Sequence, residues 1–490
     1  MTQRRVDVIV VGGGPAGATA AWALARRGVN VTLVDRARFP REKVCGDYLE
    51  PAALRIARAM GAPSVLPGSG QPVIRRNSVY FGPHRAWSGS IPYYDGADGL
   101  PDHGMIVPRT RLDAELLAAA AAAGAVVRED CAVASVTRDA GLMQVALANG
   151  ELLTAPLVVG ADGVESGVAR SMGIVRRDRR HIGIARRLYL EGLDIAEDEA
   201  VVWFDDDQIP GYGWLFPTGC GGGNVGVGLL SEAASRQDLL VPATLEDALK
   251  RLAIRHPGCG NARPVGPPVG GIVKAYGAIT TNHFAGGLLV GDAGCFADPI
   301  TGEGISQGME SAVIATRTLM AALAAGRFEA ADLARFDREF RAHFDPGMRW
   351  LGFCAALMRN WHFRHWLWRI TRRGFEEAAR NPDVARVAGS GFGGLDIRPR
   401  DIIVQLWSRV FSAGLEDGIR LLAALIAGRP PRGDGLAGDV EAWQRAWRES
   451  LADDPAFHAR WLADLGQALF ALIPALRHGG MNPRRVGLEL

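Results

Sequence analysis

Two glycine-rich stretches, almost 280 residues apart, hold the residues of this sequence that are best suited to chemistry. The first, residues 12–17 (GGGPAG), fits the pattern GxGxxG through Gly12, Gly14 and Gly17. The second occupies residues 291–305 (GDAGCFADPITGEGI). Glycines at this spacing permit a tight turn and close backbone approach, so a pyrophosphate can rest on the N-terminus of the helix that follows.

The elements around the first stretch support a nucleotide site. Residues 6–11 (VDVIVV) form a short apolar run typical of a strand, and residues 18–27 have helical composition. A second apolar run, residues 29–34, ends at Asp35, whose carboxylate is placed to accept hydrogen bonds from a ribose hydroxyl. Strand, turn, helix and acid together predict a dinucleotide site. They do not separate FAD from NAD.

Three later segments make that separation. Residues 107–113 (VPRTRLD) lead into a helical stretch, residues 157–163 (LVVGADG) read as a strand and a turn, and Gly291-Asp292 opens the second glycine-rich stretch. In this order they resemble the signatures of the FAD-dependent group that includes the aromatic hydroxylases, flavin halogenases and geranylgeranyl reductases. The resemblance spans about residues 5–330. It implies that Asp292 contacts the flavin ribityl chain and that Arg109 contacts the cofactor.

Three further blocks distinguish the branches of this group. Residues 39–51 contain the pattern Lys-x-Cys-Gly-x-x-Leu, residues 211–217 read GYGWLFP, and residues 298–305 read DPITGEGI. All three are similar to the geranylgeranyl reductase family, which carries Cys-Gly and Tyr-x-Trp-x-Phe-Pro at these places. Flavin halogenases usually carry Gly-Glu-Ser or Gly-Glu-Ala-Thr, a Trp-x-Trp-x-Ile-Pro block and a relaying lysine. The chain therefore resembles the reductases more closely.

The resemblance and the glycine-rich loops define the residues expected to bind FAD. Gly302 and Gly304 are expected to open a helix near Ile305, whose positive end would face the flavin and stabilise its anionic reduced form. The full expected set is Gly12, Gly14, Pro15, Ala16, Gly17, Asp35, Arg36, Lys43, Cys45, Gly46, Asp47, Arg109, Val133, Asp162, Asp292, Pro299, Gly302, Gly304 and Ile305.

The substrate side is expected along residues 211–217. Tyr212, Trp214 and Phe216 alternate along a predicted strand, so they project to one face and could wall an apolar tunnel, with Pro217 beside them. A packed sheet core is the structural alternative. Cys45 is the candidate catalytic residue, as a proton donor; the alternative is a buried cysteine that only shapes the pocket.

The family resemblance implies an ene reduction, in which reduced FAD delivers hydride to one alkene carbon and the other takes a proton from Cys45, a tyrosine or water. The implied substrates are polyprenyl chains on diphosphates, lipids, quinones or chlorophyll precursors. The electron donor is expected to be NAD(P)H, ferredoxin or a similar carrier, although no second GxGxxG with a predicted strand before it and a predicted helix after it is seen in the sequence. A monooxygenase, more remotely a halogenase, or a non-enzymatic flavin-binding protein remain the alternatives.

Composition limits the remaining possibilities. A chain of 490 residues is longer than one hydrophobic core usually supports, so more than one domain is expected. Its net charge of only +2 gives no reason to expect nucleic acid as a partner. The six cysteines form no CxxC pair, so no metal site is expected and a cytoplasmic location is favoured. Arg4-Arg5 before an apolar run mimics a signal peptide, but we interpret the run as the first strand.

The predicted architecture is α/β: a Rossmann-type FAD-binding domain, an antiparallel-sheet substrate domain and a C-terminal helical region. The expected boundaries are residues 1–177 with 272–330, residues 178–271, and residues 331–490. The aromatic and basic segment 361–369 could lie in a membrane interface, giving peripheral membrane contact, or could close the substrate tunnel. No transmembrane helix is expected. Helices are expected at 244–256, 402–427 and 457–476, and loops at 389–394 and 428–438.

Overall fold

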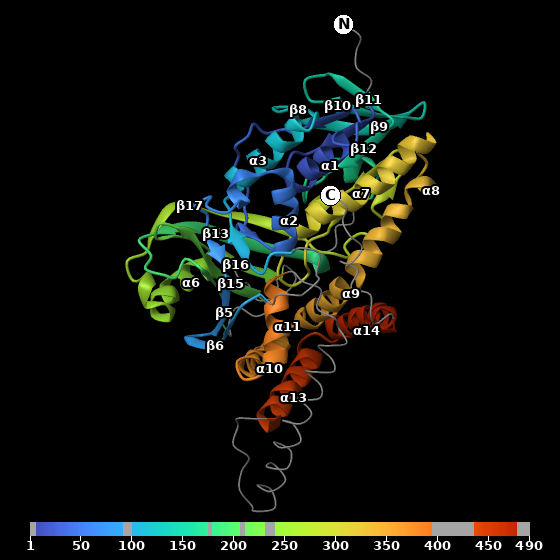
Figure 1. Cartoon of the computed structure of the whole chain (residues 1–490). Coiled ribbons are helices and arrows are strands. Elements are labelled where there is room, and N and C mark those ends of the chain that lie inside the picture. Colours follow the sequence, from blue (N-terminus) through green and yellow to red (C-terminus); the bar gives the residue numbers. More distant parts are fainter. Residues whose placement is uncertain are drawn as a thin grey trace, which may run out of the picture.

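The computed structural model describes residues 6–91, 100–174, 179–205, 211–230, 241–393 and 436–477. The expected α/β fold class is confirmed: a parallel nucleotide-binding sheet, a second and larger sheet, and helices that follow both in the chain (Figure 1). In Figure 1, α9 runs downward from beside α7, and α13 reaches below both sheets. The division into domains at the expected boundaries stays a prediction.

The nucleotide-binding sheet is parallel over five of its strands, which run in the order β19-β12-β1-β2-β8. Val8 and Val10 of β1 face the core that contains α1, α3 and α7, whereas Ile9 and Val11 face a separate small sheet. This alternation follows from the two-residue period of a strand, and burial on both faces explains the continuous apolar run. The elements are β1 (Val8–Val11), β2 (Val31–Val34), β8 (Val126–Arg128), β12 (Leu157–Gly160), β18 (His283–Phe284), β19 (Gly287–Leu289), α1 (Pro15–Ala25), α3 (Arg109–Ala122), α4 (Gly167–Ser171) and α7 (Ile305–Ala325), with β9 (Val133–Asp139), β10 (Leu142–Leu147) and β11 (Leu152–Ala155) in the small sheet.

The second sheet has seven strands in the order β17-β13-β16-β15-β14-β5-β6, and only the β14–β5 pair is parallel. Helix α6 covers one face through Leu245, Ala248 and Leu252, and confirms the helix expected at 244–256. Strands β5 and β6 come from far earlier in the chain than the segment expected to form this sheet. The strands are β5 (Arg76–Phe81), β6 (His84–Gly89), β13 (Ile182–Glu191), β14 (Glu199–Phe204), β15 (Gly211–Gly219), β16 (Gly222–Leu230) and β17 (Arg263–Lys274), with α6 at Val241–Arg255.

A short three-stranded sheet, in the order β3-β7-β4, is formed by segments between β2 and β8 in the chain. Its first strand begins directly after the Cys45-Gly46-Asp47 segment and leads into α2, so it ties that segment to the core of the nucleotide-binding domain. The elements are β3 (Tyr48–Leu49), β4 (Val73–Ile74), β7 (Gly104–Ile106) and α2 (Pro51–Met60).

The C-terminal helices pack back onto both sheets. Phe336 and Phe340 of α9 pack against Phe296, which belongs to the second glycine-rich stretch, with ring centroids 6.3 and 4.9 Å apart. In α11, Phe392 stacks on Trp87 of β6 at 5.8 Å. The helices are α8 (Ala330–Leu333), α9 (Arg335–Met358), α10 (Arg364–Ala378), α11 (Pro382–Phe392), α13 (Leu436–Asp453) and α14 (Pro455–Arg477).

Two expectations about this region can be scored. The helix expected at 457–476 is confirmed by α14, but the loop expected at 389–394 is wrong because α11 continues to Phe392. Burial of Val384 against the aromatic residues of β5 and β6 outweighs the low helix propensity of the glycines. The helix expected at 402–427 and most of the loop expected at 428–438 lie outside the described residues. Within the described ranges, no helix is long and apolar enough to cross a membrane.

We expect Phe336→Ala to lower the free energy of unfolding by about 3–5 kcal/mol, the usual cost of removing a buried aromatic ring. Phe336 is fully buried in the aromatic cluster that joins α9 to the second glycine-rich stretch. The measurement is urea denaturation followed by tryptophan fluorescence. Phe470→Ala is the matched control, since Phe470 is 74% exposed, and an equal loss in both variants would contradict this account.

Candidate active site

The first glycine-rich loop has the geometry that a pyrophosphate requires. A Cβ on Gly12 would lie 2.3 Å from the carbonyl oxygen of Ala161, and a Cβ on Gly17 would lie 1.9 Å from the carbonyl oxygen of Gly12. Only glycine therefore fits either position. Helix α1 begins at Pro15, and its N-cap residue Gly14 provides no side-chain cap. The free N–H groups of its first turn are thus available to an anion.

The two distant glycine-rich stretches meet in the structure. A Cβ on Gly291 would lie 2.8 Å from the Cβ of Ala16, and the Cα of Gly308 in α7 lies beside both residues. Helix α7 begins at Ile305 with Gly304 as N-cap and no side-chain cap, as expected. Its N-terminus offers a second set of free N–H groups, suited to a flavin that carries negative charge when reduced.

One cavity of about 1420 Å³ joins these loops to the second sheet and to α9, α10 and α11. Among the expected site residues, Gly17, Asp47 and Pro217 do not line it. Gly17 packs under the loop, and Pro217 points to the opposite face of β15 because successive side chains of a strand alternate. The expected residues that do line it are Gly12, Gly14, Pro15, Ala16, Asp35, Arg36, Lys43, Cys45, Gly46, Arg109, Val133, Asp162, Tyr212, Trp214, Phe216, Asp292, Pro299, Gly302, Gly304 and Ile305.

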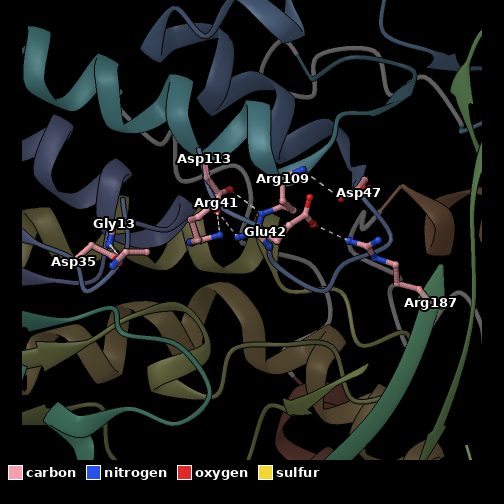
Figure 2. Close-up of polar contacts among 9 residues, drawn as sticks. Gly13, Asp35, Arg41, Glu42, Asp47, Arg109, Asp113 and Arg187 are labelled. Atoms are coloured by element: carbon pink, nitrogen blue, oxygen red, sulfur yellow. Dashed lines mark hydrogen bonds and ion pairs between the residues drawn. The ribbon is translucent and has the colours of Figure 1, made fainter. Parts of the chain in front are cut away.

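Two of the lining carboxylates hold backbone turns in place. Asp35 accepts hydrogen bonds from the N–H of Gly13 at 2.6 Å and of Ala37 at 2.8 Å, so it fixes the glycine-rich loop (Figure 2). Asp162 accepts from the Ser166 hydroxyl at 2.5 Å and from the N–H of Gly167 at 2.6 Å, at the start of α4. A carboxylate has about four acceptor positions, so Asp35 keeps capacity for a ribose hydroxyl.

Arg109 belongs to a buried charge cluster on α3. Its guanidinium donates two hydrogen bonds to Asp113, at 2.7 and 2.8 Å, and Arg41 pairs with the same carboxylate at 2.8 Å (Figure 2). Asp113 is fully buried beneath these two guanidinium groups. Arg109 also lines the cavity, close to Cys45. The structure shows its pairing with Asp113, whereas its contact with a cofactor stays a prediction.

Asp47 connects the Cys45-Gly46 segment to two other elements. Its carboxylate accepts hydrogen bonds from the Tyr189 hydroxyl at 2.6 Å, the Asn224 amide at 2.9 Å and the backbone N–H of Arg109 at 3.3 Å. Asn224 also donates to the carbonyl oxygen of Cys45 at 2.9 Å. Burial raises the pKa of Asp47, against the opposing effect of hydrogen bonds from Tyr189 and Asn224. The second sheet thereby fixes the loop that carries Cys45.

The aromatic block of β15 lies on the cavity as the alternation predicted. The Trp214 ring covers Gly226 of β16, where a Cβ would lie 2.2 Å from the ring, and its N–H donates to Asn224 at 3.1 Å. A Cβ on Gly46 would lie 3.1 Å from the ring of Phe216. The Tyr212 hydroxyl donates to the carbonyl oxygen of Thr301. The Cys-Gly segment, the aromatic block and the second glycine-rich stretch are therefore adjacent.

The thiol of Cys45 stays protonated in this environment. Burial raises its pKa, while the neighbouring Arg109 guanidinium acts in the opposite direction. The backbone N–H of Asp47 points at its sulfur at 3.3 Å. A protonated thiol is consistent with either role considered for Cys45, since a donor and an inert filler are both neutral.

Sequence patterns missed an acidic group and the C-terminal wall of the cavity. Glu50, Asp298 and Glu303 all line it; each belongs to a motif identified in the sequence, but none was predicted as a site residue. Burial raises the pKa of Asp298 to about 6 and that of Glu303 well above its usual value. The missed wall consists of His343, Phe344, Gly347, Met348, Trp350, Leu351, Gly352, Cys354, Ala355, Met358, Arg359, Leu367, Thr371, Phe375, Val387, Ala388, Gly391 and Phe392.

Contacts of the C-terminal helices distinguish the two roles considered for segment 361–369, membrane contact and closure of the cavity. Phe363 and Leu367 are buried against Ala446, Phe457 and Trp461 of α13 and α14, and Leu367 also lines the cavity. These apolar side chains face the interior of the protein. The structure thus favours closure of the cavity over the membrane-interface alternative for this segment.

Sequence relatives of this chain are FAD-binding proteins and reductases. Residues 5–228 match the family model for an FAD binding domain. The menaquinone reductase of Mycolicibacterium smegmatis is 33% identical over 333 residues, which cover 64% of this chain and 76% of the relative. Digeranylgeranylglycerophospholipid reductase 2 of Methanopyrus kandleri is 28% identical over 345 residues, covering 69% of this chain and 83% of the relative.

Solved structures share the fold. A geranylgeranyl bacteriochlorophyll reductase-like protein of Thermoplasma acidophilum matches with a TM-score of 0.64 at 23% identity, covering 82% of this chain and 98% of its own. A myxobacterial chondrochloren halogenase matches with a TM-score of 0.60 at 26% identity, covering 72% and 83%. The fold itself therefore occurs in both reductases and halogenases, and the site residues must distinguish them.

We expect Asp47→Ala to lower the unfolding midpoint and to release FAD, because three donors lose their acceptor and a buried donor left unsatisfied costs about 1–3 kcal/mol. The measurements are thermal unfolding and the ratio of FAD to protein after gel filtration. Asp247→Ala is the control, since Asp247 pairs only with Lys250 at the surface. Full FAD retention in Asp47→Ala would contradict the role assigned to this carboxylate.

We also expect Asp298 to make stability depend on pH. Its pKa of about 6 exceeds the usual 3.8, so the unfolded chain ionises first and stability falls as pH rises from about 4 to about 6. The loss is of order 3 kcal/mol. Asp298→Asn keeps an acceptor for the N–H groups of Ile300 and Thr301 and should remove this contribution. Urea denaturation at several pH values measures it, and parallel curves for both proteins would refute it.

Proposed function

The chain belongs to the geranylgeranyl reductase family of FAD-dependent oxidoreductases, and from this premise we propose that it reduces carbon–carbon double bonds of an isoprenoid chain. The observation that carries the proposal is the single cavity that continues from the cofactor loops, past Cys45 and the aromatic block, to α11. At about 1420 Å³ it exceeds the roughly 300–1,000 Å³ of an ordinary ligand pocket. It has room for the cofactor and a second, largely apolar molecule.

The relatives support the same substrate class. Those named above are described as reductases of menaquinone and of digeranylgeranylglycerophospholipid. We therefore propose a polyprenyl chain attached to a quinone or a lipid as the substrate. Its chain would lie along Trp214 and Phe216 and extend toward Phe375 and Phe392 of the C-terminal helices.

Different residues of the chain would bind the cofactor, exclude water and hold the proton for the reaction. Bound in its reduced form, FAD supplies the hydride for one carbon of the alkene. The uncapped N-termini of α1 and α7 would hold its pyrophosphate and its negatively charged ring edge, while Asp35 would hold the ribose. The aromatic wall excludes water, so that a proton held in the cavity reaches the second carbon without exchange with solvent.

We propose that the electrons arrive from NAD(P)H, ferredoxin or a similar carrier that docks transiently. Among the described residues, only residues 12–17 place a GxGxxG pattern between a strand and a helix, and we assign that loop to FAD. The physiological donor would therefore reach the flavin without a Rossmann domain of its own in this chain.

The main alternative is an oxygen-using monooxygenase or halogenase on the same scaffold. The structural similarity to the chondrochloren halogenase supports this alternative. The decisive experiment reduces the purified holoenzyme without oxygen and adds a menaquinone or a digeranylgeranyl lipid. Saturated product, with reoxidised flavin in equal amount, is expected from a reductase. Product that forms only with oxygen, and that contains oxygen or halogen, would sink the proposal.

We expect Ala388→Phe to shorten the chains that the enzyme accepts, because Ala388 lines the α11 end of the cavity. The value of kcat/KM should fall by about 10-fold or more for chains of four isoprene units and remain unchanged for two, since a lost apolar contact of this size is worth about 1–3 kcal/mol. Ala385→Phe, on the same helix but outside the cavity lining, is the matched control. Equal loss for both chain lengths would contradict the proposed orientation.

A further inference from the structure

A pair of glutamates faces the cavity at a point where the described structure places no cation. Glu50 ends the segment before α2, and Glu303 lies between Gly302 and Gly304 before α7. Both line the cavity. Among the described residues, no lysine, arginine or histidine forms an ion pair with Glu50, Glu303 or the nearby Asp298.

Glu50 is the unusual member of the pair. It occupies the N-cap position of α2, where a side chain commonly accepts from the first N–H groups of the helix, yet it makes no cap bond. Its side chain is buried, with 2% exposure, and neither carboxyl oxygen has a hydrogen-bond donor among the described residues. A buried acceptor without a donor is costly, so the arrangement calls for a proton from a neighbour.

Glu303 is that neighbour. Its other contacts hold it in place: the Thr301 hydroxyl donates to Oε2 at 3.3 Å, and the Asp298 N–H donates to the Glu303 carbonyl oxygen at 2.7 Å. Burial raises the pKa of Glu303 well above its usual value, and the negative charge of Glu50 raises it further. A protonated Glu303 supplies the donor that Glu50 lacks.

The pair lies beside the aromatic block. Tyr48, two residues before Glu50, has its ring 5.4 Å from that of Phe216, and the Tyr212 hydroxyl donates to Thr301, two residues before Glu303. The carboxyl groups therefore stand where the cofactor loop meets the wall assigned to the substrate. No other described carboxyl pair combines burial, an unsatisfied oxygen and this position.

We propose that the carboxylic acid of Glu303 donates the proton that completes alkene reduction, and that Glu50 is the positioning residue that keeps the proton there. This inference rests on the proposed function. The two electrons and the first hydrogen come from reduced FAD as hydride. The Glu303 O–H bond breaks and a C–H bond forms at the second alkene carbon. Glu303 is left as a carboxylate, which regains its proton from water after product leaves.

The other titratable groups that face this point do not compete in the neutral range. Burial raises the pKa values of Tyr48 on β3, Tyr212 on β15 and Cys354 on α9, the last to about 12, and it also raises that of Cys45. Asp298, with a pKa of about 6, ionises below Glu303 and then adds to the negative charge around it. The alkaline limb of a pH profile therefore reports Glu303.

The test uses holoenzyme reduced without oxygen and mixed with substrate in a single turnover. We expect Glu303→Gln to slow alkene reduction at pH 7 by about 100-fold or more, the usual contribution of a positioned acid. Glu50→Gln should move the alkaline limb to lower pH, because it removes a negative neighbour of the acid. Glu310→Gln is the control, because Glu310 is buried in α7, the helix that follows Glu303, pairs with His343 and does not line the cavity.

A second readout does not depend on turnover. At pH 7 the infrared spectrum of the protein should contain the C=O stretching band of a protonated carboxylic acid, which Glu303→Gln should remove and Glu310→Gln should keep. FAD content and the rate of flavin photoreduction should match those of the unmodified protein in all variants, because glutamine preserves the shape of the side chain.

The failures can be told apart. If the unmodified protein reduces no alkene, the proposed function fails. If it does, and Glu303→Gln turns over at an unchanged rate, or loses no more than Glu310→Gln, the proton assignment is overturned. A loss confined to Cys45→Ser would overturn it in favour of the thiol.

Discussion

The position of the Cys45-Gly46 segment depends on one buried carboxylate. Asp47 is fully enclosed, and its three donors come from β13, β16 and the start of α3. Each donor satisfies an oxygen that would otherwise be stranded in an apolar environment, which makes the three bonds interdependent. Through them the nucleotide-binding core and the second sheet share a single reference point. Cys45 and Gly46 are held against Phe216 as a consequence.

The polar chemistry of the cavity shows a second constraint, since one group of its acids has no cationic partner. Arg109 and Arg41 both pair with Asp113 (Figure 2), whereas Glu50, Asp298 and Glu303 gather by the aromatic wall without an ion pair to a described cation. In a low-dielectric site, paired charges stay ionised, whereas burial raises the pKa of an acid that has no cationic partner. The cavity therefore has an end with an excess of positive charge, suited to a phosphate-bearing cofactor, and a separate acidic end where burial raises the pKa of Glu303 well above its usual value.

The sequence predicted those features that depend on local backbone geometry. The GxGxxG turn, the uncapped start of α7 at Ile305 and the alternation of Tyr212, Trp214 and Phe216 each follow from glycine sterics or from the period of a strand. The pairing of β5 with β14 and the cavity lining of α9 to α11 depend on contacts between distant segments, about which a local pattern carries no information. Glu50 was missed for the same reason: at a helix start it looks like an ordinary cap, and only the fold shows that it makes none.

The stacking of Phe392 on Trp87 joins two segments that are synthesised at different times. Trp87 belongs to β6, which leaves the ribosome early, whereas the helix bearing Phe392 is made after both sheets. During synthesis the nucleotide-binding core is complete while one side of the cavity is still open. The side of the cavity that α10 and α11 line can therefore close only after both sheets have been synthesised.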